Sequence, residues 1–303
     1  MTLTIPDDYC MTTDRLSEAI DRCADKCILV IGDNATDFTY HGAPAGKSKD
    51  ADVDVFLIDE LQSNPGCAGN VELQCQCLCS GSMLVCDPCI SVSHIKFVDN
   101  GQHIFRATQV KRSPMGVFQY DYDQTIEEYQ PDAILFAEYD EWGKGWLGPN
   151  LEQVKAAIQS SEHLNIPRVL SLRTMFPDIP DIPVITNCTN KLPNNGYKRK
   201  APTIYTNEGR EVSMFLDGKE YCQETVWLHN FEPCRAVGAG DAFSAGLVAA
   251  RTSGMLDWEE AIEFASIAAA SFIYTSSPHD ELGYIDPEVM IELTDLGTIE
   301  DDE

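Results

Sequence analysis

A glycine-rich turn with a single acid is the stretch of this chain whose residue types best suit chemistry. Residues 237–247 read VGAGDAFSAGL. Gly238, Ala239 and Gly240 can expose backbone N–H groups at the start of the helix that the following small residues predict, and a helix N-terminus attracts anions. Asp241 places a carboxylate at the same point, where it would repel a bound phosphate.

Two interpretations account for Asp241. In the first, the backbone amides stabilise the charge that develops on a phosphoryl group in transfer, and the carboxylate takes the proton from the attacking hydroxyl. In the second, Asp241 only caps the next turn of the helix. The motif alone does not decide between a base for phosphoryl transfer and a structural cap.

The chain's charge narrows the classes of partner. Its 303 residues include 21 basic and 49 acidic ones, for a net charge of −28. Because so acidic a surface repels phosphates, we expect no binding to nucleic acid or to anionic membranes, and a small molecule held in a local basic pocket instead. The sequence has no apolar run of membrane-spanning length and no signal-peptide pattern. We therefore expect a cytoplasmic protein whose 12 cysteines are thiols.

The elements that must position this turn can be read from hydrophobic patterns. Short, continuous apolar runs predict buried parallel strands at 27–33, 133–138, 168–172 and 183–186. Other patterns predict helices at 13–26, 149–163, 240–252 and 257–274, and a hairpin-like pair of strands at 203–218. Strands that alternate with helices indicate an α/β fold whose sheet is covered on both faces.

Two further segments alternate apolar and polar residues, as strands with one wet face do. They lie at about 38–62 and 102–125, with strands expected at 53–59, 103–112 and 116–124. We expect them to form a small accessory sheet, inserted as a lid into a single domain that spans residues 1–303.

Two other motifs have both a chemical and a structural interpretation. GAPAGKS (42–48) is close to a phosphate-binding P-loop, but it has three residues between its glycines where four are needed, so we favour an ordinary loop. The five cysteines between residues 75 and 89 include one CxxC pair without an evident second pair for zinc. For these we favour buried thiols, the first three of them in a helix.

The glycine-rich turn and several other stretches occur, in the same order, in one known family. The chain resembles the ribokinase-like, phosphofructokinase-B-type carbohydrate kinases, and most closely their D-glycero-β-D-manno-heptose-7-phosphate kinase branch. The family signature, approximately D-T-x-G-A-G-D-x-F-x-x-G, is similar to RAVGAGDAFSAG (235–246) from Gly238 onward. The other similar stretches are ILVIGDNATDFTYHG with Asp33 and Asp37, NPGCAGNVELQ with Gly66 and Asn70, RATQVK with Arg106 and Lys111, AEYDEWGKGWL with Lys144, and VITN with Asn187.

The resemblance implies a ribokinase-like three-layer sandwich with a central, mostly parallel sheet and a small β-sheet lid. It implies ATP and Mg²⁺ as cofactors, with ATP along the carboxyl edge of the sheet. Asp241 would be the general base, and the backbone of Gly238, Ala239 and Gly240 would form the anion hole with it. The remaining implied roles are nucleotide binding by Asn187, Thr206, Glu208 and Gly209, and Mg²⁺ binding through water by Asn187 and Asn190.

The sugar is expected beneath the lid, where the resemblance assigns two sets of residues. Asp33, Asp37, Gly66 and Asn70 would bind the sugar, and Arg106, Lys111 and Lys144 would clamp a phosphate already on it. For Arg106 and Lys111, a solvated surface is an equally good interpretation. Dimerisation through the lid is common among such kinases, so a homodimer is expected.

Four departures from the family pattern affect these expectations. Arg235 stands where the family usually has an Asp that helps to bind a monovalent cation, so we expect activity without potassium. Asn190 replaces the carboxylate that organises Mg²⁺, which prefers charged oxygen ligands. Cys67 replaces a glycine of the sugar-binding turn and adds bulk there. The stretch between Asn70 and Arg106 is short, so a strand–helix unit is expected to be missing.

Three functions stay open on the sequence. The first is an ATP-dependent kinase for a sugar phosphate, with the anomeric hydroxyl as the expected acceptor. The second is a kinase for a free sugar or a nucleoside. The third is an inactive relative that binds a ligand or a partner.

Overall fold

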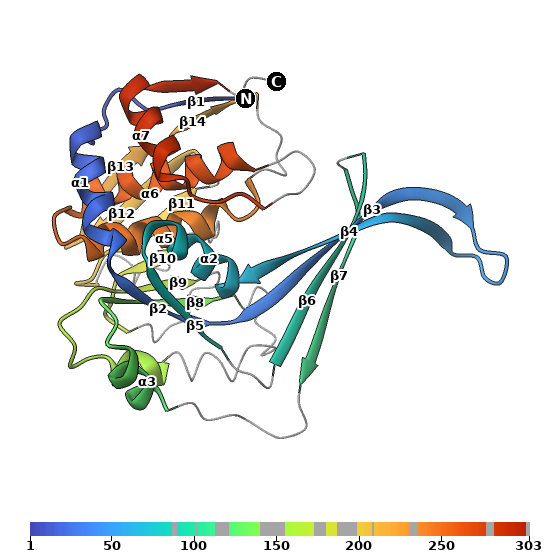
Figure 1. The fold of residues 1–303 in the computed structure, drawn as a ribbon, viewed down its shortest axis with the longest axis horizontal. Helices are drawn as coiled ribbons and strands as arrows, with labels where there is room; N and C mark the ends of the chain where they lie inside the picture. Colours follow the sequence, from blue (N-terminus) through green and yellow to red (C-terminus); the bar gives the residue numbers. More distant parts are fainter. Residues whose placement is uncertain are drawn as a thin grey trace.

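A central sheet carries the fold. The computed structural model describes residues 1–86, 90–100, 102–112, 121–139, 155–172, 180–186, 199–207, 209–230, 236–276 and 282–300. Within these, the sheet consists of β2 (Cys27–Gly32), β5 (Gly81–Val85), β8 (Ala133–Glu138), β9 (Arg168–Leu172), β10 (Val184–Thr186), β11 (Thr203–Asn207), β12 (Glu211–Leu216) and β13 (Lys219–Glu224). Its order is β13-β12-β11-β10-β9-β8-β2-β5 (Figure 1). All neighbours from β11 to β5 are parallel, and β12 and β13 are antiparallel additions.

Successive apolar side chains of the buried strands point to opposite faces of the sheet, so each face has its own core. Ile28 and Val30 of β2 pack into a core with α1 (Thr13–Ala24), α2 (Ala68–Leu78), α5 (Ala239–Thr252), α6 (Trp258–Thr275) and α7 (Pro287–Leu296). Leu29 and Ile31 point the other way, into a core with α3 (Tyr122–Tyr129) and the helical residues 155–160. Successive side chains of a strand point to opposite faces, so two covered faces need an apolar residue at every position. The predicted α/β three-layer sandwich is therefore confirmed.

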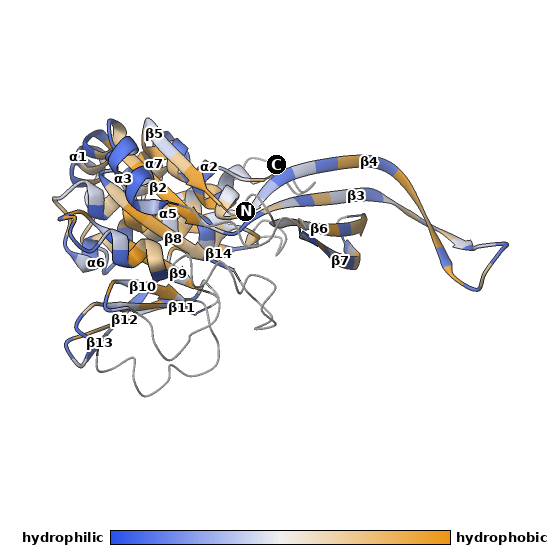
Figure 2. Cartoon of the chain, turned by 90° about the horizontal axis from the view of Figure 1, so that it is seen from below, coloured by the Kyte–Doolittle hydropathy of each residue, from blue (hydrophilic) through white to orange (hydrophobic). Residues whose placement is uncertain are grey.

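The lid is a separate four-stranded sheet. It comprises β3 (Asn34–Lys47), β4 (Asp54–Cys67), β6 (Ile90–Asp99) and β7 (Gln102–Arg112), in the order β4-β3-β6-β7. The long β3–β4 hairpin projects away from the body (Figures 1 and 2). Phe97 is stacked on Tyr40 and edge-on to Phe56, which ties three lid strands together. Since β3 begins directly after β2, the lid is anchored at the carboxyl edge of the main sheet.

The sequence-based boundaries of the lid need correction. Its first segment is longer than 38–62, and the strand predicted at 116–124 is wrong where it can be tested. Residues 113–120 lie outside the described residues, and Tyr122 begins a helix. The Asp121 side chain accepts a hydrogen bond from Gln124 N, which is an N-cap and favours a helix over a strand. Strands β5 and β6 were not predicted, and no helix lies between them in the described part.

The other predicted elements are found with small changes at their ends. The helices at 13–26, 240–252 and 257–274 and the pair of strands at 203–218 are confirmed, and the helix at 149–163 is described only from residue 155. A small sheet of β1 (Thr2–Thr4), β14 (Trp227–His229) and β15 (Thr298–Glu300) was missed. It brings both ends of the chain together (Figure 1).

The predicted burial of the cysteine cluster is confirmed only in part. Cys75 of α2 and Cys79, the C-cap of that helix, are buried, and burial raises the pKa of the Cys75 thiol, whereas Cys77 and Cys86 are half-buried. In the described ranges no cluster of three His, Cys, Asp or Glu side chains is placed to bind a metal.

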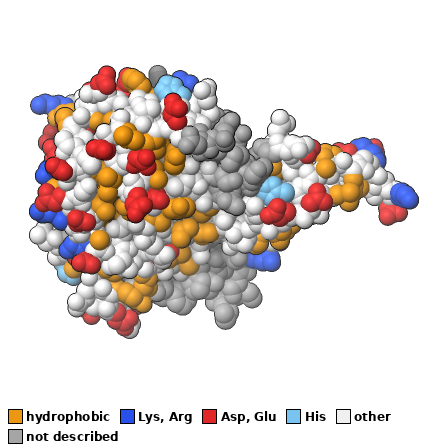
Figure 3. Space-filling view, turned by 45° about the horizontal axis from the view of Figure 1, so that its top comes forward, with side chains coloured by type: hydrophobic (Ala, Val, Ile, Leu, Met, Phe, Trp, Pro, Cys, Tyr) orange, Lys and Arg blue, Asp and Glu red, His pale blue; other side chains and the backbone are white. Residues whose placement is uncertain are grey.

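None of the described helices combines the length and the hydrophobicity needed to cross a membrane. Acidic side chains are spread over the body in the view of Figure 3.

Candidate active site

The candidate site is a cavity of about 430 Å³ at the carboxyl edge of the main sheet, beneath the lid. Asp33 follows β2, Tyr139 follows β8, and Thr186 ends β10; all three side chains line the cavity. The chain's first long strand, β2, lies between β8 and β5, so the strand order reverses there. Ligands of open α/β sheets bind at such reversals, outside the carboxyl ends of the strands.

The N-terminus of α5 opens into this cavity. Gly238 is its N-cap, with φ 101°, and a Cβ there would lie 2.7 Å from Phe272 Cζ and 2.9 Å from Asn70 Nδ2. Only glycine suits that conformation and that space. At Gly240, by contrast, a Cβ would meet no heavy atom within 4 Å. The first turn of the helix therefore presents bare backbone to the cavity, as an anion site requires.

Asp241 lies inside α5, as its third residue, and the N-cap is Gly238. Asn70 Nδ2 donates to Asp241 Oδ2 at 2.6 Å, and the Tyr139 hydroxyl donates to Oδ1. The carboxylate is thus held at the cavity wall by two side chains from distant elements. The structure favours a role in the cavity over the capping interpretation.

A buried glutamine holds Asn70 in place. Gln74, one turn later on α2, donates from Nε2 to Asn70 Oδ1 at 3.1 Å and to the carbonyl of Gly283 at 3.2 Å. Its Oε1 accepts from Ile285 N at 2.9 Å. These bonds orient the Asn70 amide so that its Nδ2 faces Asp241. Neither Gln74 nor Tyr139 was predicted from the sequence.

The two predicted N-terminal acids have different surroundings. Asp33 is buried, and its Oδ2 accepts from Tyr139 N at 3.0 Å, so it ties β2 to the segment after β8. Asp37 Oδ2 lies 3.6 Å from Lys96 Nζ, while its Oδ1 is buried and has no hydrogen-bond partner in the described part. A Cβ on Gly66 would lie 2.5 Å from that Oδ1, so glycine is needed for this close approach. Asp37 therefore has acceptor capacity for a ligand hydroxyl.

The lid contributes two cations, a histidine and a threonine to the cavity. In the register of β6 and β7, His94 is opposite Thr108 and Lys96 is opposite Arg106, so these four side chains share one face. All four line the cavity. Lys111 is five residues from Arg106, an odd spacing that puts it on the other face of β7, and it does not line the cavity.

The predicted phosphate clamp is therefore corrected at Lys111, which lies on the other face of β7 from Arg106. His94, Lys96 and Thr108 were missed. Residues 94–97 read HIKF, and this short alternation could have placed His94 and Lys96 on one face of a strand.

A second cavity of about 470 Å³ adjoins the first on the other side of the α5 N-terminus. Thr206, Ala236 and Gly240 line both cavities. Its other lining residues are mostly apolar and include Val212, Val226, Leu228, Phe243, Ala269, Ala270 and Ile273; Gly209 also lines it. Of the predicted nucleotide-binding residues, Thr206 and Gly209 lie here. The predicted residues Lys144, Asn187, Asn190, Glu208 and Arg235 lie outside the described residues.

Comparison with known proteins was made on sequence and on structure. No protein-family model and no curated protein sequence matches the chain. Solved structures do. A ribokinase from Thermotoga maritima matches with a TM-score of 0.60 and 14% identity over 89% of this chain and 99% of its own.

Two other structures match at similar levels. Ribokinase from Arabidopsis thaliana, complexed with ribose and ATP, has a TM-score of 0.58 and 14% identity over 89% of this chain and 99% of its own. A nucleoside kinase from Methanocaldococcus jannaschii has a TM-score of 0.58 and 11% identity over 90% of this chain and 100% of its own. At such identities the similarity establishes the fold, which is ribokinase-like.

Proposed function

We propose that the protein is an ATP-dependent kinase, formed by residues 1–303 as one domain, that phosphorylates a hydroxyl of a sugar phosphate. The observation that carries this proposal is the place of Asp241. Its carboxylate is held by Asn70 and Tyr139 in the cavity beneath the lid, at an open helix N-terminus that also borders a mainly apolar cavity. Phosphoryl transfer needs an acceptor site and a nucleotide site that meet at a base and an anion hole.

In this mechanism the sugar lies in the cavity beneath the lid and ATP lies with its base in the apolar cavity. Asp241 accepts the proton of the attacking hydroxyl, which makes the oxygen a better nucleophile. The backbone N–H groups of Gly238, Ala239 and Gly240 would face the transferring phosphoryl group and stabilise its charge, and the Asp241 N–H, which donates to the Gly238 carbonyl, closes the turn. Gly240 lines both cavities, so this anion hole would lie where donor and acceptor meet.

Mg²⁺ is the metal that this function requires. Magnesium is commonly bound by substrate phosphates, water and one or two protein oxygens, so it does not need a preformed cluster of carboxylates. When bound, it would neutralise charge on the phosphates of ATP. Asn187 and Asn190 remain the residues we propose for it, and Arg235 remains the reason to expect activity without potassium. Strong activation by potassium would contradict that expectation.

Two cations of the lid favour a substrate that carries its own phosphate. Arg106 and Lys96 line the cavity from adjacent strands, and guanidinium and ammonium groups are the usual partners of phosphate. Asp37 Oδ1 would accept from a sugar hydroxyl. This combination fits the heptose-7-phosphate kinase branch that the sequence resembles, with the anomeric hydroxyl as the acceptor.

The test is turnover on a panel of free sugars, nucleosides and sugar phosphates with ATP and Mg²⁺, followed by ³¹P NMR. The Asp241→Asn variant, shown to be folded by its unchanged thermal transition, is measured in parallel. We expect a new phosphate resonance with a sugar phosphate as acceptor, and a loss of about 10²–10⁴-fold in the variant, because a general base contributes that much. If no acceptor is phosphorylated, or if the variant is as active, the proposal fails.

A kinase for a free sugar or a nucleoside is the second candidate. Arg106→Ala separates it from the first. Loss of the guanidinium should raise KM for a substrate with its own phosphate and leave KM for an unphosphorylated substrate unchanged. An inactive ligand-binding protein is the third candidate, and it predicts binding to ATP or sugar without turnover.

Self-association through the lid remains our proposal for the oligomeric state. Leu57, Ile58 and Leu61 on the projecting β4 strand are each about half exposed, and so is Phe105 on β7. A second lid could cover these side chains. Sedimentation of the wild-type chain beside a Leu57→Glu/Leu61→Glu variant tests it, and equal sedimentation of both would contradict it. A cytoplasmic location also remains a prediction.

A further inference from the structure

Cys67 occupies an unusual position in the candidate site. It is the N-cap of α2, at the end of β4, with φ 53° and ψ −132°. Few residues other than glycine adopt that conformation. Its thiol is half-buried, is not part of a disulfide and lines the cavity beneath the lid. No step of the proposed phosphoryl transfer uses it.

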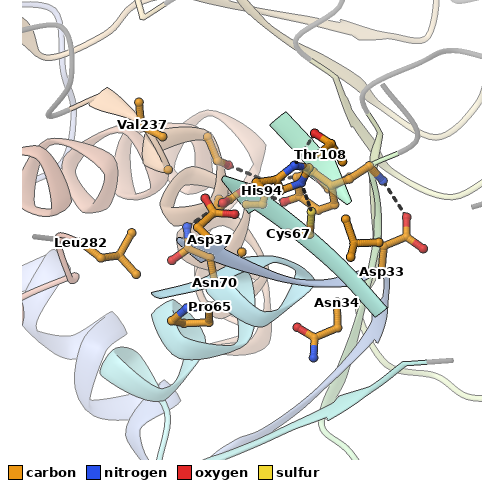
Figure 4. A pocket seen from close by; sticks show the side chains of 18 of the residues that line it. Asp33, Asn34, Asp37, Pro65, Cys67, Asn70, His94, Thr108, Val237 and Leu282 are labelled. Atoms are coloured by element: carbon orange, nitrogen blue, oxygen red, sulfur yellow. Dashed lines mark hydrogen bonds between the residues drawn. The ribbon is translucent and has the colours of Figure 1, made fainter. Parts of the chain in front are cut away.

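A histidine of the lid faces this thiol. Cys67 Sγ lies 3.9 Å from His94 Nε2, and His94 Nδ1 lies 3.1 Å from Thr108 Oγ1 (Figure 4). If Nδ1–H donates to the threonine hydroxyl, Nε2 is the ring atom that can accept the thiol proton. The imidazolium that results stabilises the thiolate, which is the nucleophilic form of cysteine. The lid sheet fixes this arrangement, because His94 and Thr108 are cross-strand partners.

The surroundings set Cys67 apart from the buried cysteines. Cys23, Cys75 and Cys79 are fully or almost fully buried in the core beside the helices. The charged and titratable groups that line the cavity with Cys67 and His94 are Asp33, Asp37, Lys96, Arg106, Tyr139 and Asp241. The two lid cations among them favour a thiolate, and the carboxylates oppose it. A small reagent that enters the cavity therefore meets a thiol with its own proton acceptor.

We propose that Cys67, paired with His94, is a modification site that forms a mixed disulfide with low-molecular-weight disulfides. The Cys67 thiolate attacks one sulfur of the small disulfide. A new S–S bond forms as the original one breaks, and the released thiolate takes the proton that His94 had accepted. The second half of the small disulfide stays attached to Cys67 inside the cavity, where it competes with any ligand for space. A thiol reductant reverses the step by the same exchange.

The test is the rate at which bis(2-hydroxyethyl) disulfide labels Cys67, read by mass spectrometry of the full-length protein after digestion. Cleavage after Glu60 and Glu72 isolates Cys67 as the one cysteine of residues 61–72, and cleavage after Glu18 isolates the exposed Cys10 in residues 1–18. Cys10 is thus an internal reference in every sample. The variants are His94→Gln, which removes the proton acceptor, and Lys96→Gln, which removes a cavity cation of the same strand.

We expect Cys67 to react about 10-fold faster than Cys10 at pH 7, since only a few per cent of an ordinary thiol is ionised there. In His94→Gln the Cys67 rate should fall to about that of Cys10, and its rise with pH should move to higher pH. The Cys10 rate should not change. The proposal is overturned if Cys67 reacts no faster than Cys10, if His94→Gln leaves its rate unchanged, or if Lys96→Gln lowers the rate as much as His94→Gln does. Because labelling is read directly, these outcomes do not depend on kinase activity.

Discussion

Asn70 on α2 donates its side-chain amide to the carboxylate of Asp241 on α5 at 2.6 Å, across 171 residues of sequence. The two helices pack side by side in the core on one face of the sheet. Tyr139, from the segment after β8, donates to the same carboxylate. The group that we propose as the base is therefore held by side chains of two other elements.

Removing the tyrosine hydroxyl tests this arrangement. Tyr139→Phe takes away a hydrogen bond that stabilises the ionised form of Asp241. The carboxylate then becomes easier to protonate, so the acidic limb of the pH–rate profile should move to higher pH, with a fall in kcat of about 10-fold for one lost bond to a charged group. An acidic limb at the wild-type pH would contradict this role of Tyr139. The profile of kcat from pH 5 to pH 9 is the measurement.

Gln74 should matter for stability far more than its neighbour on the same helix. Gln74→Ala leaves Ile285 N–H and the Gly283 carbonyl buried without their partner. We expect the free energy of unfolding to fall by about 2–4 kcal/mol. The matched control is Gln76→Ala, because Gln76 is exposed and, within the described residues, its side chain bonds only to that of Glu72; the free energy of unfolding should change by no more than about 0.5 kcal/mol. Urea denaturation measures the free energy of unfolding of both variants. An equal decrease in Gln74→Ala and Gln76→Ala would refute the prediction.

The two glycines of the anion hole should respond differently to alanine. Gly238→Ala puts a Cβ 2.7 Å from Phe272 at a φ of 101°, so we expect a loss of stability of about 1–3 kcal/mol or more. Gly240→Ala meets no atom within 4 Å, and alanine suits a helix better than glycine does, so the fold should be kept.

The new methyl group at position 240 borders both cavities, however, and should weaken nucleotide binding. Thermal melting and ATP titration, made on both variants, measure the two effects. A stable Gly238→Ala variant, or undiminished ATP binding by a folded Gly240→Ala variant, would show that the turn is not built as described.

Glu260 and Glu263 of α6 should contribute to the free energy of unfolding with opposite dependences on pH. Burial raises the pKa of Glu263, although Cys10 N, Met11 N and Gln223 Nε2 donate to its carboxylate. The hydrogen bond from Arg15 lowers the pKa of Glu260. The folded state thus holds a proton on Glu263 more tightly, and one on Glu260 less tightly, than the unfolded chain does, where the pKa of Glu is about 4.3.

The consequences follow from proton linkage. As pH rises from about 4.3, the contribution of Glu263 to the free energy of unfolding decreases until its folded pKa is passed. The contribution of Glu260 is present above the unfolded pKa and is lost as pH falls through its lower, folded pKa. The difference in unfolding free energy between wild type and Glu263→Gln should therefore fall as pH rises from 4 to 7, and that between wild type and Glu260→Gln should fall as pH is lowered from 5 to 3. If the two differences in unfolding free energy changed in the same direction with pH, the prediction would be contradicted.

The sequence by itself determined the parts of this protein that depend on neighbours along the chain. The continuous apolar runs at residues 27–33 and 133–138 predicted buried strands, because a strand covered on both faces needs apolar residues at successive positions. The glycine-rich turn before Asp241 predicted an open helix start. Asp37, Gly66 and Asn70 were found through motifs, and all three line the cavity.

Tertiary structure decided what depends on pairing between distant segments. The register of β6 against β7 puts Lys96 beside Arg106 and His94 beside Thr108, and it turns Lys111 to the other face. Packing of α2 against α5 makes Asn70 a partner of Asp241, and the end of β8 brings Tyr139 to the same carboxylate. Periodicity is a local property that identifies an element and its faces. Which residue of another element lies opposite is fixed by the pairing and packing of the whole chain, and the candidate site consists almost entirely of such contacts.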